Sequence, residues 1–546
     1  MGRKFKHWEC RSSEVPTSSD AVLQTLLSNR SFIPIDRLEY GDHGLEEVIR
    51  VVSDAIRNRR RIALYADYDV DGTMSCVSWI WFLRALGYDN FVHYIPCRFK
   101  EGYGVNLNAV TNLIEVQQAE LIITMDTGIT ANAEAEYCKS RGVAFVCTDH
   151  HKIQLEKMPD CTILNPKLHP DADYQELCGC GITFVLLRRL AVEFPVPPSL
   201  WTDLLALAGM ATICDVVPLN RVNHRLARLG VEGLLKSQRP IIKKLLRSAS
   251  LSGNADEKDV GFRLGPRINA VGRLGHADRV IEAFVTEYPD LLIEQMGLCN
   301  EERKKIQANI VAQATKQALE YPDAPILFLG NSQWHSGVVG IAASKIAEKF
   351  WKPTWLFQEI EGKGRGSARS IPGFDVTDAM QGLSDVFLKF GGHRAAAGYS
   401  FDLTKTAEIR GRLCEVAETL RRAKPAQWES RIDFDCALDP AWIELSIVDK
   451  VDDLKPFGHG FEEPKFCLTT PVLGVNFYLD KTTGEKRHTA VLTPGARGGT
   501  QKIMFFNEVL EELEGVTQAR FLVTLSRNIY QGRASVSLFG LDYDVM

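Results

Sequence analysis

The stretch IALYADYDVDG (residues 62–72) decides how the first half of this chain folds. Its first five residues have the composition of a buried strand, and Asp67, Asp69 and Asp71 follow directly. Three carboxylates so close together repel one another unless a cation neutralises them. Ligands of open α/β sheets bind beyond the carboxyl ends of the strands, which is where these side chains are expected. The alternative interpretation is a solvated turn with an ordinary Asp-Gly pair.

Aspartate or histidine follows two later strands and one helix of this region in the same way. The segments are ITMDTG with Asp126, CTDHH with Asp149, His150 and His151, and ATICDVVP with Asp215. Because the carboxyl ends of parallel strands meet at one edge of a sheet, we expect these side chains to lie together. Carboxylate and imidazole ligands without a thiolate favour Mn²⁺ or Mg²⁺ over a structural zinc ion. The pattern therefore predicts a metal site at this edge.

Strands and helices alternate around these motifs. The expected strands are IALYA (62–66), FVHYIP (91–96), LIITM (121–125) and VAFVC (143–147), and helices are expected at 45–60, 72–86 and 131–140. Such alternation is typical of the α/β class with a mostly parallel, doubly wound sheet. Helices follow over 182–250, and one long helix is expected at 290–320. Because that length is unusual for a packed helix, we expect it to span two domains.

The chain has 546 residues, several times the usual size of one domain. A second, smaller α/β unit begins at ILFLG (326–330), and short alternating segments from Arg431 onward predict an all-β barrel. The expected organisation is an N-terminal arm (1–44), a first α/β domain (45–230), a helical connector (231–322), a second α/β domain (323–424) and the barrel (425–546).

Composition excludes several classes of protein. Hydrophobic residues make up 45% and charged residues 24%, which is the balance of a globular protein rather than a disordered or fibrous one. The net charge of −5 argues against a non-specific polybasic binder. No apolar run approaches 18 residues and the N-terminus lacks a signal-peptide core, so the expected location is the cytoplasm, without a membrane. The 13 cysteines include no CxxC pair and are expected to be reduced, mostly in the core.

The motifs resemble a known family in their residues and in their order. YADYDVDG, MDTG, TDHH and the later Asp215 resemble the four motifs of the DHH phosphoesterase superfamily. GPRINAVGR (265–273), WHSGVVGIAASKI (334–346), GRGSARS (364–370) and GGHRAAAG (391–398) narrow the resemblance to RecJ-type single-strand-specific exonucleases. The resemblance covers residues 45–546 and implies a DHH domain, a connecting helix, a DHH-associated domain and a C-terminal OB-fold.

The resemblance also implies a site with two metal ions, Mn²⁺ or Mg²⁺. The implied ligands are Asp67 and Asp69 for one ion, Asp71, His150 and Asp215 for the other, and Asp126 as the bridge. Two ions about 4 Å apart can activate a water and stabilise the leaving oxygen of an in-line displacement. His151 is expected to touch the scissile phosphate rather than bind metal. Tyr65 departs from the pattern, because related phosphatases carry a metal-binding histidine there.

Further polar residues are expected to hold phosphate groups. Arg267, Asn269 and Arg273 of GPRINAVGR are expected in the catalytic site, because guanidinium and amide groups grip phosphate oxygens. A helix-capping loop with surface arginines is the alternative. The resemblance assigns substrate binding, including a terminal 5′-phosphate, to a second set, for which a polar strand face is the alternative. That set is His335, Ser336, Ser367, Arg369, Gly391, Gly392 and His393.

The expected barrel interleaves aromatic and basic residues, as barrels that bind single strands do. These residues are Phe457, Phe461, Phe466 and Phe505 with Lys455, Lys465, Lys486, Arg487 and Lys502. Most of the aromatics are nevertheless expected to be core residues. The family pattern PFGxGNPEP reads PFGHGFEEP here, with Phe461 and Glu462 departing from it.

The expected function is metal-dependent 5′→3′ digestion of single-stranded DNA to mononucleotides in recombination and repair. Single-stranded DNA is the expected partner, and the family implies a single-strand binding protein and a helicase. One alternative is a nanoRNase or cyclic-dinucleotide phosphodiesterase, although such relatives are short and lack the barrel. The other is a non-catalytic DHH scaffold, although such proteins lose metal ligands that this chain keeps.

Overall fold

The computed structural model describes residues 4–12, 15–30, 32, 34–35, 38, 44–169, 174–251, 253, 255–480 and 483–546. The chain divides into two compact units. The first, here called the parallel-sheet unit, comprises Ile33–Lys304 and the short segment Pro456–Glu462. The second, here called the two-module unit, comprises Met1–Phe32, Lys305–Lys455 and Glu463–Met546.

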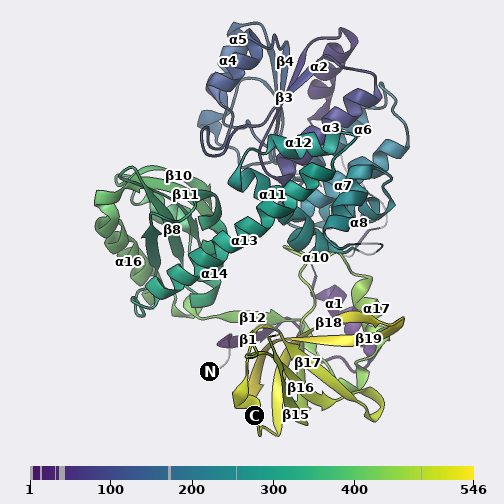
Figure 1. Cartoon of the computed structure of the whole chain (residues 1–546), viewed down its shortest axis with the longest axis vertical. Helices are drawn as coiled ribbons and strands as arrows, with labels where there is room; N and C mark the ends of the chain where they lie inside the picture. Colours follow the sequence, from purple (N-terminus) through teal and green to yellow (C-terminus); the bar gives the residue numbers. More distant parts are fainter. Residues whose placement is uncertain are drawn as a thin grey trace. The chain divides into compact units, whose positions relative to one another are not determined.

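The parallel-sheet unit is built on five parallel strands in the order β3-β2-β4-β5-β6 (Figure 1). The strands are β2 (Ile62–Ala66), β3 (Phe91–Tyr94), β4 (Leu121–Met125), β5 (Ala144–Thr148) and β6 (Thr162–Leu164). β2 and β4 are buried on both faces, which explains why they read as continuous apolar runs rather than as alternating ones. This arrangement confirms the expected α/β class.

Successive residues of the central strands enter two different cores. Ile62 and Leu64 pack in the larger core with α2 (Leu45–Arg57), α3 (Val70–Ala85) and α6 (Gly179–Leu190). Ala63 and Tyr65 pack on the opposite face with α4 (Leu107–Glu115) and α5 (Asn132–Ser140). Because side chains alternate across a strand, both faces of the sheet are covered by helices. The sheet is therefore doubly wound, as expected.

A helical layer completes this unit. Its helices are α7 (Ser199–Cys214), α8 (Arg221–Lys236), α9 (Pro240–Ser248), α10 (Glu257–Asp259), α11 (Gly265–Leu274) and α12 (Asp278–Val285). A π-helical turn, Val260–Leu264, leads directly into α11, so GPRINAVGR is helical rather than a loop. The long helix α13 (Asp290–Ala318) follows, and the division between the two units falls inside it, after Lys304. The long helix and its place across two domains are thus confirmed.

The first module of the two-module unit is a mixed sheet in the order β10-β11-β9-β8-β7. Its strands are β7 (Leu327–Asn331), β8 (Thr354–Ile360), β9 (Lys363–Arg369), β10 (Phe387–His393) and β11 (Ala396–Asp402). The helices are α14 (Ser336–Phe350), α15 (Val376–Gln381) and α16 (Thr406–Ala423). α14 approaches β9 closely, because a Cβ atom at Gly340 would lie 3.0 Å from the Ser367 hydroxyl.

The second module is a largely antiparallel sheet in the order β13-β14-β18-β19-β17-β16-β15, with α17 (Leu445–Asp452) beside it. The strands are β13 (Cys436–Ala437), β14 (Phe466–Pro471), β15 (Gly474–Leu479), β16 (Lys486–Pro494), β17 (Thr500–Phe505), β18 (Gln518–Tyr530) and β19 (Arg533–Val545). The expected all-β C-terminal module is therefore present.

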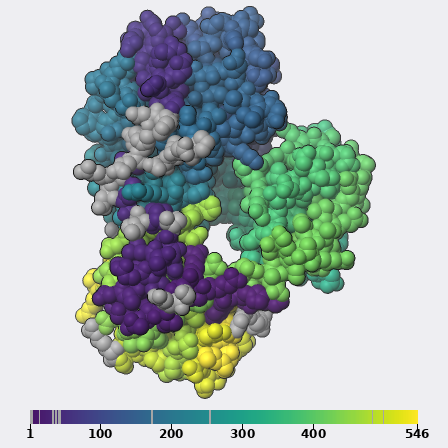
Figure 2. Space-filling view, turned by 180° about the vertical axis from the view of Figure 1, so that it is seen from behind, coloured from purple at the N-terminus to yellow at the C-terminus, as the bar shows by residue number. Residues whose placement is uncertain are grey.

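The N-terminal segment lies on this C-terminal module, which the sequence alone did not indicate (Figure 2). Strand β1 (His7–Cys10) pairs in parallel with β12 (Arg431–Phe434), and α1 (Ser19–Ser28) follows. Arg30 and Asp435 form a buried ion pair at 2.9 Å. Asp542 accepts hydrogen bonds from two backbone N–H groups of the segment and from the Trp8 indole. The segment is thus an integral part of the C-terminal module.

None of the described helices has the length and apolar character that crossing a membrane requires. All 13 cysteines are free thiols, and seven of them are buried. The expectation that most cysteines lie in the core is therefore confirmed.

Candidate metal centre and phosphate-binding residues

The strands of the parallel sheet bring carboxylates from distant parts of the chain to one edge. Asp67, Asp126 and Asp149 are each the first residue after a strand, and β2, β4 and β5 are consecutive in the sheet. Each of these aspartates still donates its backbone N–H to the neighbouring strand or its end, over 3.1–3.3 Å. Their side chains therefore start from adjacent, fixed positions at the carboxyl edge, as the sequence predicted.

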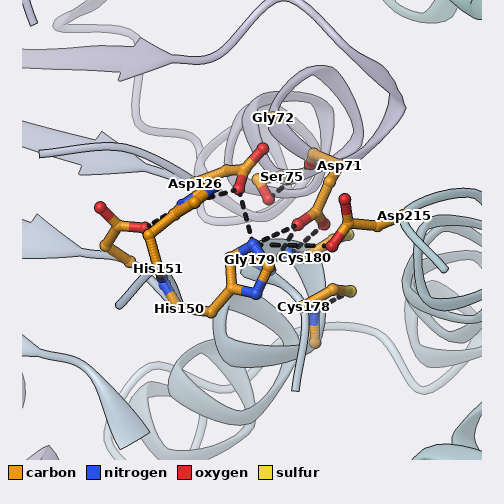
Figure 3. A network of polar contacts seen from close by, with 12 residues as sticks. Asp71, Gly72, Ser75, Asp126, His150, His151, Cys178, Gly179, Cys180 and Asp215 are labelled. Atoms are coloured by element: carbon orange, nitrogen blue, oxygen red, sulfur yellow. Dashed lines mark hydrogen bonds and ion pairs between the residues drawn. The ribbon is translucent and has the colours of Figure 1, made fainter. Parts of the chain in front are cut away.

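Six side chains, here called the metal-site cluster, lie close enough together to hold metal ions. Figure 3 shows four of them, Asp71, Asp126, His150 and Asp215. The donors form three overlapping groups, which are Asp67, Asp69 and Asp126, then Asp71, His150 and Asp215, and finally Asp126, His150 and the neighbouring His151. Within each group the donor atoms lie within 4.8 Å of one another. His150 Nε2 lies 3.1 Å from an Asp126 oxygen, 3.6 Å from an Asp215 oxygen and 3.8 Å from an Asp71 oxygen. His150 thus joins Asp126 to the second group.

The amino-terminal end of helix α6 holds the Asp71 carboxylate. The backbone N–H groups of Gly179 and Cys180 donate to its two oxygens over 2.6 and 2.7 Å. The first N–H groups of a helix have no partner within the helix and carry partial positive charge, so a carboxylate binds well there. Any side chain at residue 179 would collide with Asp126, because its Cβ would lie 2.7 Å from the Asp126 Cβ. The sequence analysis missed this glycine, for which LCGCG was the available signal.

Asp69 positions the start of helix α3. Its side chain caps the helix by accepting hydrogen bonds from the N–H groups of Asp71 and Gly72. A Cβ atom at Gly72 would lie 2.4 Å from the Asp67 carbonyl oxygen, so this helix turn fits against the strand end only with glycine. The Asp-Gly pair of YADYDVDG is therefore a close-packing requirement rather than a solvated turn.

The electrostatics of the metal-site cluster favour neutralisation of its carboxylates, by protons or by a cation. Burial, followed by repulsion from neighbouring carboxylates, raises the pKa of Asp67, Asp126 and Asp215 well above the usual range. The same causes raise the pKa of Asp71 to about 6. Asp67 Oδ1 is buried and accepts no hydrogen bond from the described residues. Oxygen donors with one imidazole are the ligands that Mn²⁺ and Mg²⁺ prefer, so these residues fit the expected ions.

Two strained backbone positions lie in the same place. Asp126 has a φ of +59°, and so does Val216, the residue directly after Asp215. Positive φ is unfavourable for residues with a Cβ, and most of all for a β-branched one such as valine. Such strain costs about 1–3 kcal/mol and persists where surrounding contacts enforce it, commonly at functional sites. The surrounding contacts therefore hold the backbone at Asp126 and directly after Asp215 in unfavourable conformations.

His151 is oriented by the buried Asp149. Its Nδ1 lies 2.7 Å from an Asp149 oxygen, and the same carboxylate accepts the N–H groups of His150, His151 and Ile129. Burial opposes a charge on the His151 ring, but Asp149 outweighs it and raises the pKa of this histidine. The hydroxyl of Tyr103 lies 3.1 Å from the ring nitrogens. His151 is thus set beside the metal-site cluster as a polar donor.

Tyr65 does not replace a metal ligand. Its hydroxyl donates to the Gly104 carbonyl and accepts from the Asn106 N–H, both over 3.2 Å, and its ring is fully buried. It therefore fastens the loop 97–106, which carries two residues that the sequence analysis missed, Arg98 and Tyr103. The Arg98 guanidinium lies 4.8 Å above the Tyr68 ring. Its positive charge lowers the pKa of Asp67, which burial raises. No motif in the sequence pointed to this loop.

The residues of GPRINAVGR divide into three roles. Asn269 accepts a hydrogen bond from the Val70 N–H over 3.1 Å, so it supports the backbone between Asp69 and Asp71. Arg273 lies near Tyr68. Burial raises the pKa of the Tyr68 hydroxyl, and the positive charge of Arg273 lowers it. The Arg267 guanidinium donates to the carbonyl oxygens of Arg263 and Ser248.

The residues expected to bind the substrate terminus lie on the mixed sheet. Ser367 pairs with Gly398, which pairs with Gly391, and Arg369 is linked in the same way through Ala396 to His393. Paired residues share a face of the sheet, so these side chains form one surface. Arg369 donates to the Ser367 and Ser344 hydroxyls, both over 3.1 Å.

Glycines leave room on this surface. A Cβ atom at Gly391 or Gly398 would meet nothing within 4 Å, whereas Gly392 has a φ of +148° and lies tightly against β11. His335 and Ser336 lie at the amino-terminal end of α14, where His335 accepts the N–H of Gly337. The surface is open beside Ser367 and Arg369, which is where a ligand is expected.

The four aromatics named from the sequence of the expected barrel are all buried. They are Phe457, Phe461, Phe466 and Phe505, and the first two lie in the segment that belongs to the parallel-sheet unit. The expectation that most of them are core residues is thus confirmed, and none of the four is available to stack on bases. Tyr478, Phe506 and Tyr530 are exposed instead, and Lys502 donates to the Tyr478 hydroxyl.

The described fold is similar to solved structures and to curated proteins. The crystal structure of RecJ in complex with Mn²⁺ from Thermus thermophilus gives a TM-score of 0.84 at 25% identity, covering 99% of this chain and 80% of that one. The single-stranded-DNA-specific exonuclease RecJ of Bacillus subtilis is 34% identical over 440 residues, which is 79% of this chain. The match spans 54% of that relative, so about half of its length is represented here.

Three family models match the chain in succession. They are the DHH family N-terminal domain at residues 61–210, the DHHA1 domain at 323–419 and the RecJ OB domain at 434–542. The fold and the metal-site cluster thus define a DHH-family phosphoesterase. The single-stranded-DNA-specific exonuclease RecJ of Salmonella typhimurium is 31% identical, and the match covers 96% of each chain. This chain belongs to the RecJ family.

Proposed function

We propose that this protein is a metal-dependent exonuclease that digests single-stranded DNA from the 5′ end to mononucleotides, in recombination and repair. The observation that carries the proposal is the metal-site cluster, which offers two adjacent groups of donors with His150 next to Asp126. RecJ relatives named as single-stranded-DNA-specific exonucleases support the substrate class. The T. thermophilus structure with Mn²⁺ supports the choice of ion.

The proposed ligands are Asp67 and Asp69 for one ion and Asp71, His150 and Asp215 for the other, with Asp126 shared. A bound pair of Mn²⁺ or Mg²⁺ ions would supply an activated water and stabilise the leaving oxygen of an in-line displacement. The protein holds the ligands rigidly, through helix α6 at Asp71 and through the strained backbone at Asp126. That rigidity favours the charge distribution of the transition state.

Cationic and polar groups beside the metal-site cluster are proposed to bind the scissile phosphate. His151, held by Asp149, can donate to a non-bridging oxygen, and Arg98 and Arg273 approach the Asp67–Asp71 stretch from the Tyr68 side. Arginine forms bidentate hydrogen bonds with phosphate, so two of them fix its orientation as well as its charge. Arg267 and Asn269 are proposed to bind phosphate oxygens together with Arg273, and Asn269 also supports the backbone at Val70.

The 5′→3′ polarity is proposed from the open surface of the mixed sheet. Ser367 and Arg369 would hold a terminal 5′-phosphate. Further hydrogen-bond donors would be His335, Ser336 and His393. The glycines Gly391 and Gly392 would allow the phosphate to approach the backbone closely. The exposed Tyr478, Tyr530 and Lys502 of the C-terminal module are proposed to contact the strand further along, by stacking and by charge.

The alternatives predict different substrates. A nanoRNase or cyclic-dinucleotide phosphodiesterase would prefer two-residue substrates, and the match of the RecJ OB domain at 434–542 argues against that specialisation. A non-catalytic scaffold would not need a complete set of metal ligands. All six members of the metal-site cluster are present here, which favours an enzyme.

The test is digestion of single-stranded DNA labelled at either end, with Mn²⁺, Mg²⁺ or a chelator. We expect 5′-labelled DNA to release labelled mononucleotide at once and 3′-labelled DNA to shorten progressively. Duplex DNA, single-stranded RNA and dinucleotides are the comparison substrates. Release of mononucleotide from the 3′ label first would contradict the polarity, and a preference for dinucleotides would favour the phosphodiesterase.

We further propose that the protein works in the cytoplasm with a single-strand binding protein and a helicase as partners. The free thiols of all 13 cysteines are consistent with a reducing compartment. Co-purification of the tagged full-length chain from its own cells, with nuclease treatment to remove DNA bridges, tests the partners.

A further inference from the structure

The segment Pro456–Glu462, here called the 456–462 loop, does not belong to the module that its sequence position suggests. The chain up to Lys455 and from Glu463 onward lies in the two-module unit, whereas the loop lies in the parallel-sheet unit. Within the loop, Gly458 and Phe461 exchange two backbone hydrogen bonds of 3.0 and 3.1 Å, and Gly460 has a φ of +78°. The loop is therefore a compact turn whose packing partners are in the unit with the metal-site cluster.

Those partners are the residues that follow Asp215. The His459 carbonyl accepts the N–H of Leu219 over 2.7 Å. Gly458 lies so close to Leu219 that a Cβ atom would be 2.8 Å from its Cδ1. Phe461 is fully buried, and its ring centre lies 4.6 Å from that of His224. The loop thus fixes the backbone at Leu219, four residues beyond the metal ligand.

The backbone between these two points is strained. Val216, with its φ of +59°, would relax to a negative value if the chain beyond it were free to move. Two sets of contacts oppose that movement. Asn223 donates to the carbonyl oxygens of Pro218 and Glu176 over 2.9 and 2.6 Å, and the 456–462 loop holds Leu219. The strained turn, and with it the position of Asp215, depends on both.

We propose that the 456–462 loop is a positioning element for Asp215 and so for one metal ion of the pair. This inference rests on the proposed metal centre. Metal ligands must be held within about 0.5 Å of their working positions. Asp215 is one of three donors in its group, whereas Asp67 and Asp126 are held by backbone hydrogen bonds at the ends of β4 and β5 and Asp69 by the start of α3. Loss of the loop's packing should therefore weaken one ion and spare the other.

The experiment measures Mn²⁺ binding to full-length Phe461→Ala by calorimetry and by electron paramagnetic resonance. The wild type should bind two ions and give the spectrum of a spin-coupled pair. The variant should retain one ion with unchanged affinity and lose at least about tenfold in affinity for the other, the scale of losing a ligand support. Its spectrum should show isolated Mn²⁺ at concentrations that give the pair in the wild type. Phe461→Leu, which keeps most of the apolar volume, should restore much of the second site.

Phe521→Ala is the matched control, because Phe521 is fully buried in strand β18 of the two-module unit. It should lower stability and leave both ions in place. Gly458→Val is a second variant, which pushes on Leu219 without emptying the core, and it should weaken the same single ion.

The outcomes separate the two proposals. Folded Phe461→Ala and Gly458→Val proteins that bind both ions as the wild type does would overturn the positioning role. Equal weakening of both ions would also overturn it, because the loop would then support the whole unit. A wild-type protein that binds fewer than two ions would instead refute the metal centre on which the inference rests.

Discussion

Asp126→Asn tests the shared ligand of the metal-site cluster most directly. The substitution keeps the size of the side chain and removes its charge. Asp126 belongs to the donor group with Asp67 and Asp69 and also to the donor group with His150 and His151. If Asp126 binds both ions, the variant should bind neither tightly. Cleavage of single-stranded DNA should then fall by at least about a thousandfold, the upper range for losing a single stabilising donor at an active site.

The loss of metal binding should be visible in thermal unfolding as well as in activity. An ion present at about 100 times its dissociation constant adds about 2.7 kcal/mol to the stability of the folded state. Two ions therefore add about 5 kcal/mol, and a unit of this size gains about 2 °C per kcal/mol, so saturating Mn²⁺ should raise the wild-type melting temperature by about 10 °C. The variant should show almost none of this rise. Without metal it should melt higher than the wild type, because one of several repelling carboxylates is gone.

Differential scanning fluorimetry with Mn²⁺ and with chelator is the assay. Asp203→Asn is the control, because Asp203 is a buried carboxylate near the other end of α7, paired with Arg239 and Ser237. It should lower stability yet keep the full rise with Mn²⁺. If Asp126→Asn keeps the full rise, Asp126 is not a ligand. If it keeps half, Asp126 binds one ion and does not bridge.

Three further predictions concern other parts of the molecule. Arg369→Ala should reduce the preference for 5′-phosphorylated over 5′-hydroxyl strands about tenfold or more, since hydrogen bonds to a charged group contribute about 1.5–3 kcal/mol. Competition kinetics with the two strands measure this ratio, and Arg422→Ala, at an exposed arginine of α16, is the control. An unchanged ratio would contradict the prediction. Without metal, stability should fall as pH rises from 3.8 to about 6, because the pKa of Asp71 is higher folded than unfolded. Protons compete with the metal ions for the carboxylates, so the rise in melting temperature with Mn²⁺ should become smaller below about pH 6. Melting temperatures that do not change with pH would contradict the presence of mutually repelling carboxylates. Arg30→Met should lower the free energy of unfolding by about 3–5 kcal/mol, because Asp435 is left buried without its charge partner. Denaturant unfolding measures this loss, and the added substitution Asp435→Leu should recover much of it. Unchanged stability would show that the N-terminal segment does not stabilise its module.

The metal-site cluster could be predicted because its rule is local. Each carboxylate or histidine follows an apolar run directly in the sequence, and a parallel sheet then places all strand ends at one edge. The helix ends at Asp71 and Asp215 obey the same logic, since both adjoin recognisable apolar segments. The alternation that predicted the doubly wound sheet is equally visible in a single stretch such as residues 62–66.

The missed features depend on contacts between distant segments. Arg98 and Tyr103 reach the metal-site cluster on a loop that Tyr65 fastens, and nothing within residues 97–106 signals that attachment. Gly179 is required by Asp126, and the 456–462 loop is placed by Leu219, each far away in the chain. The carbonyl oxygens of Arg263 and Ser248 that accept hydrogen bonds from Arg267 could likewise be found only in the folded chain.

The pairing of β1 with β12 has a consequence for the order in which the protein can fold during synthesis. His7 pairs with Arg431, so the partner of the first strand leaves the ribosome only after more than 400 further residues. At about 5–20 residues per second, that is an interval of about 20–80 s. Through this interval the β1 segment exposes an unpaired strand edge and the charged Arg30, while the parallel sheet synthesised after it can already close. This segment is thus made long before its partner and is among the last to reach its native place, so a chaperone that covers the strand edge would protect it during synthesis.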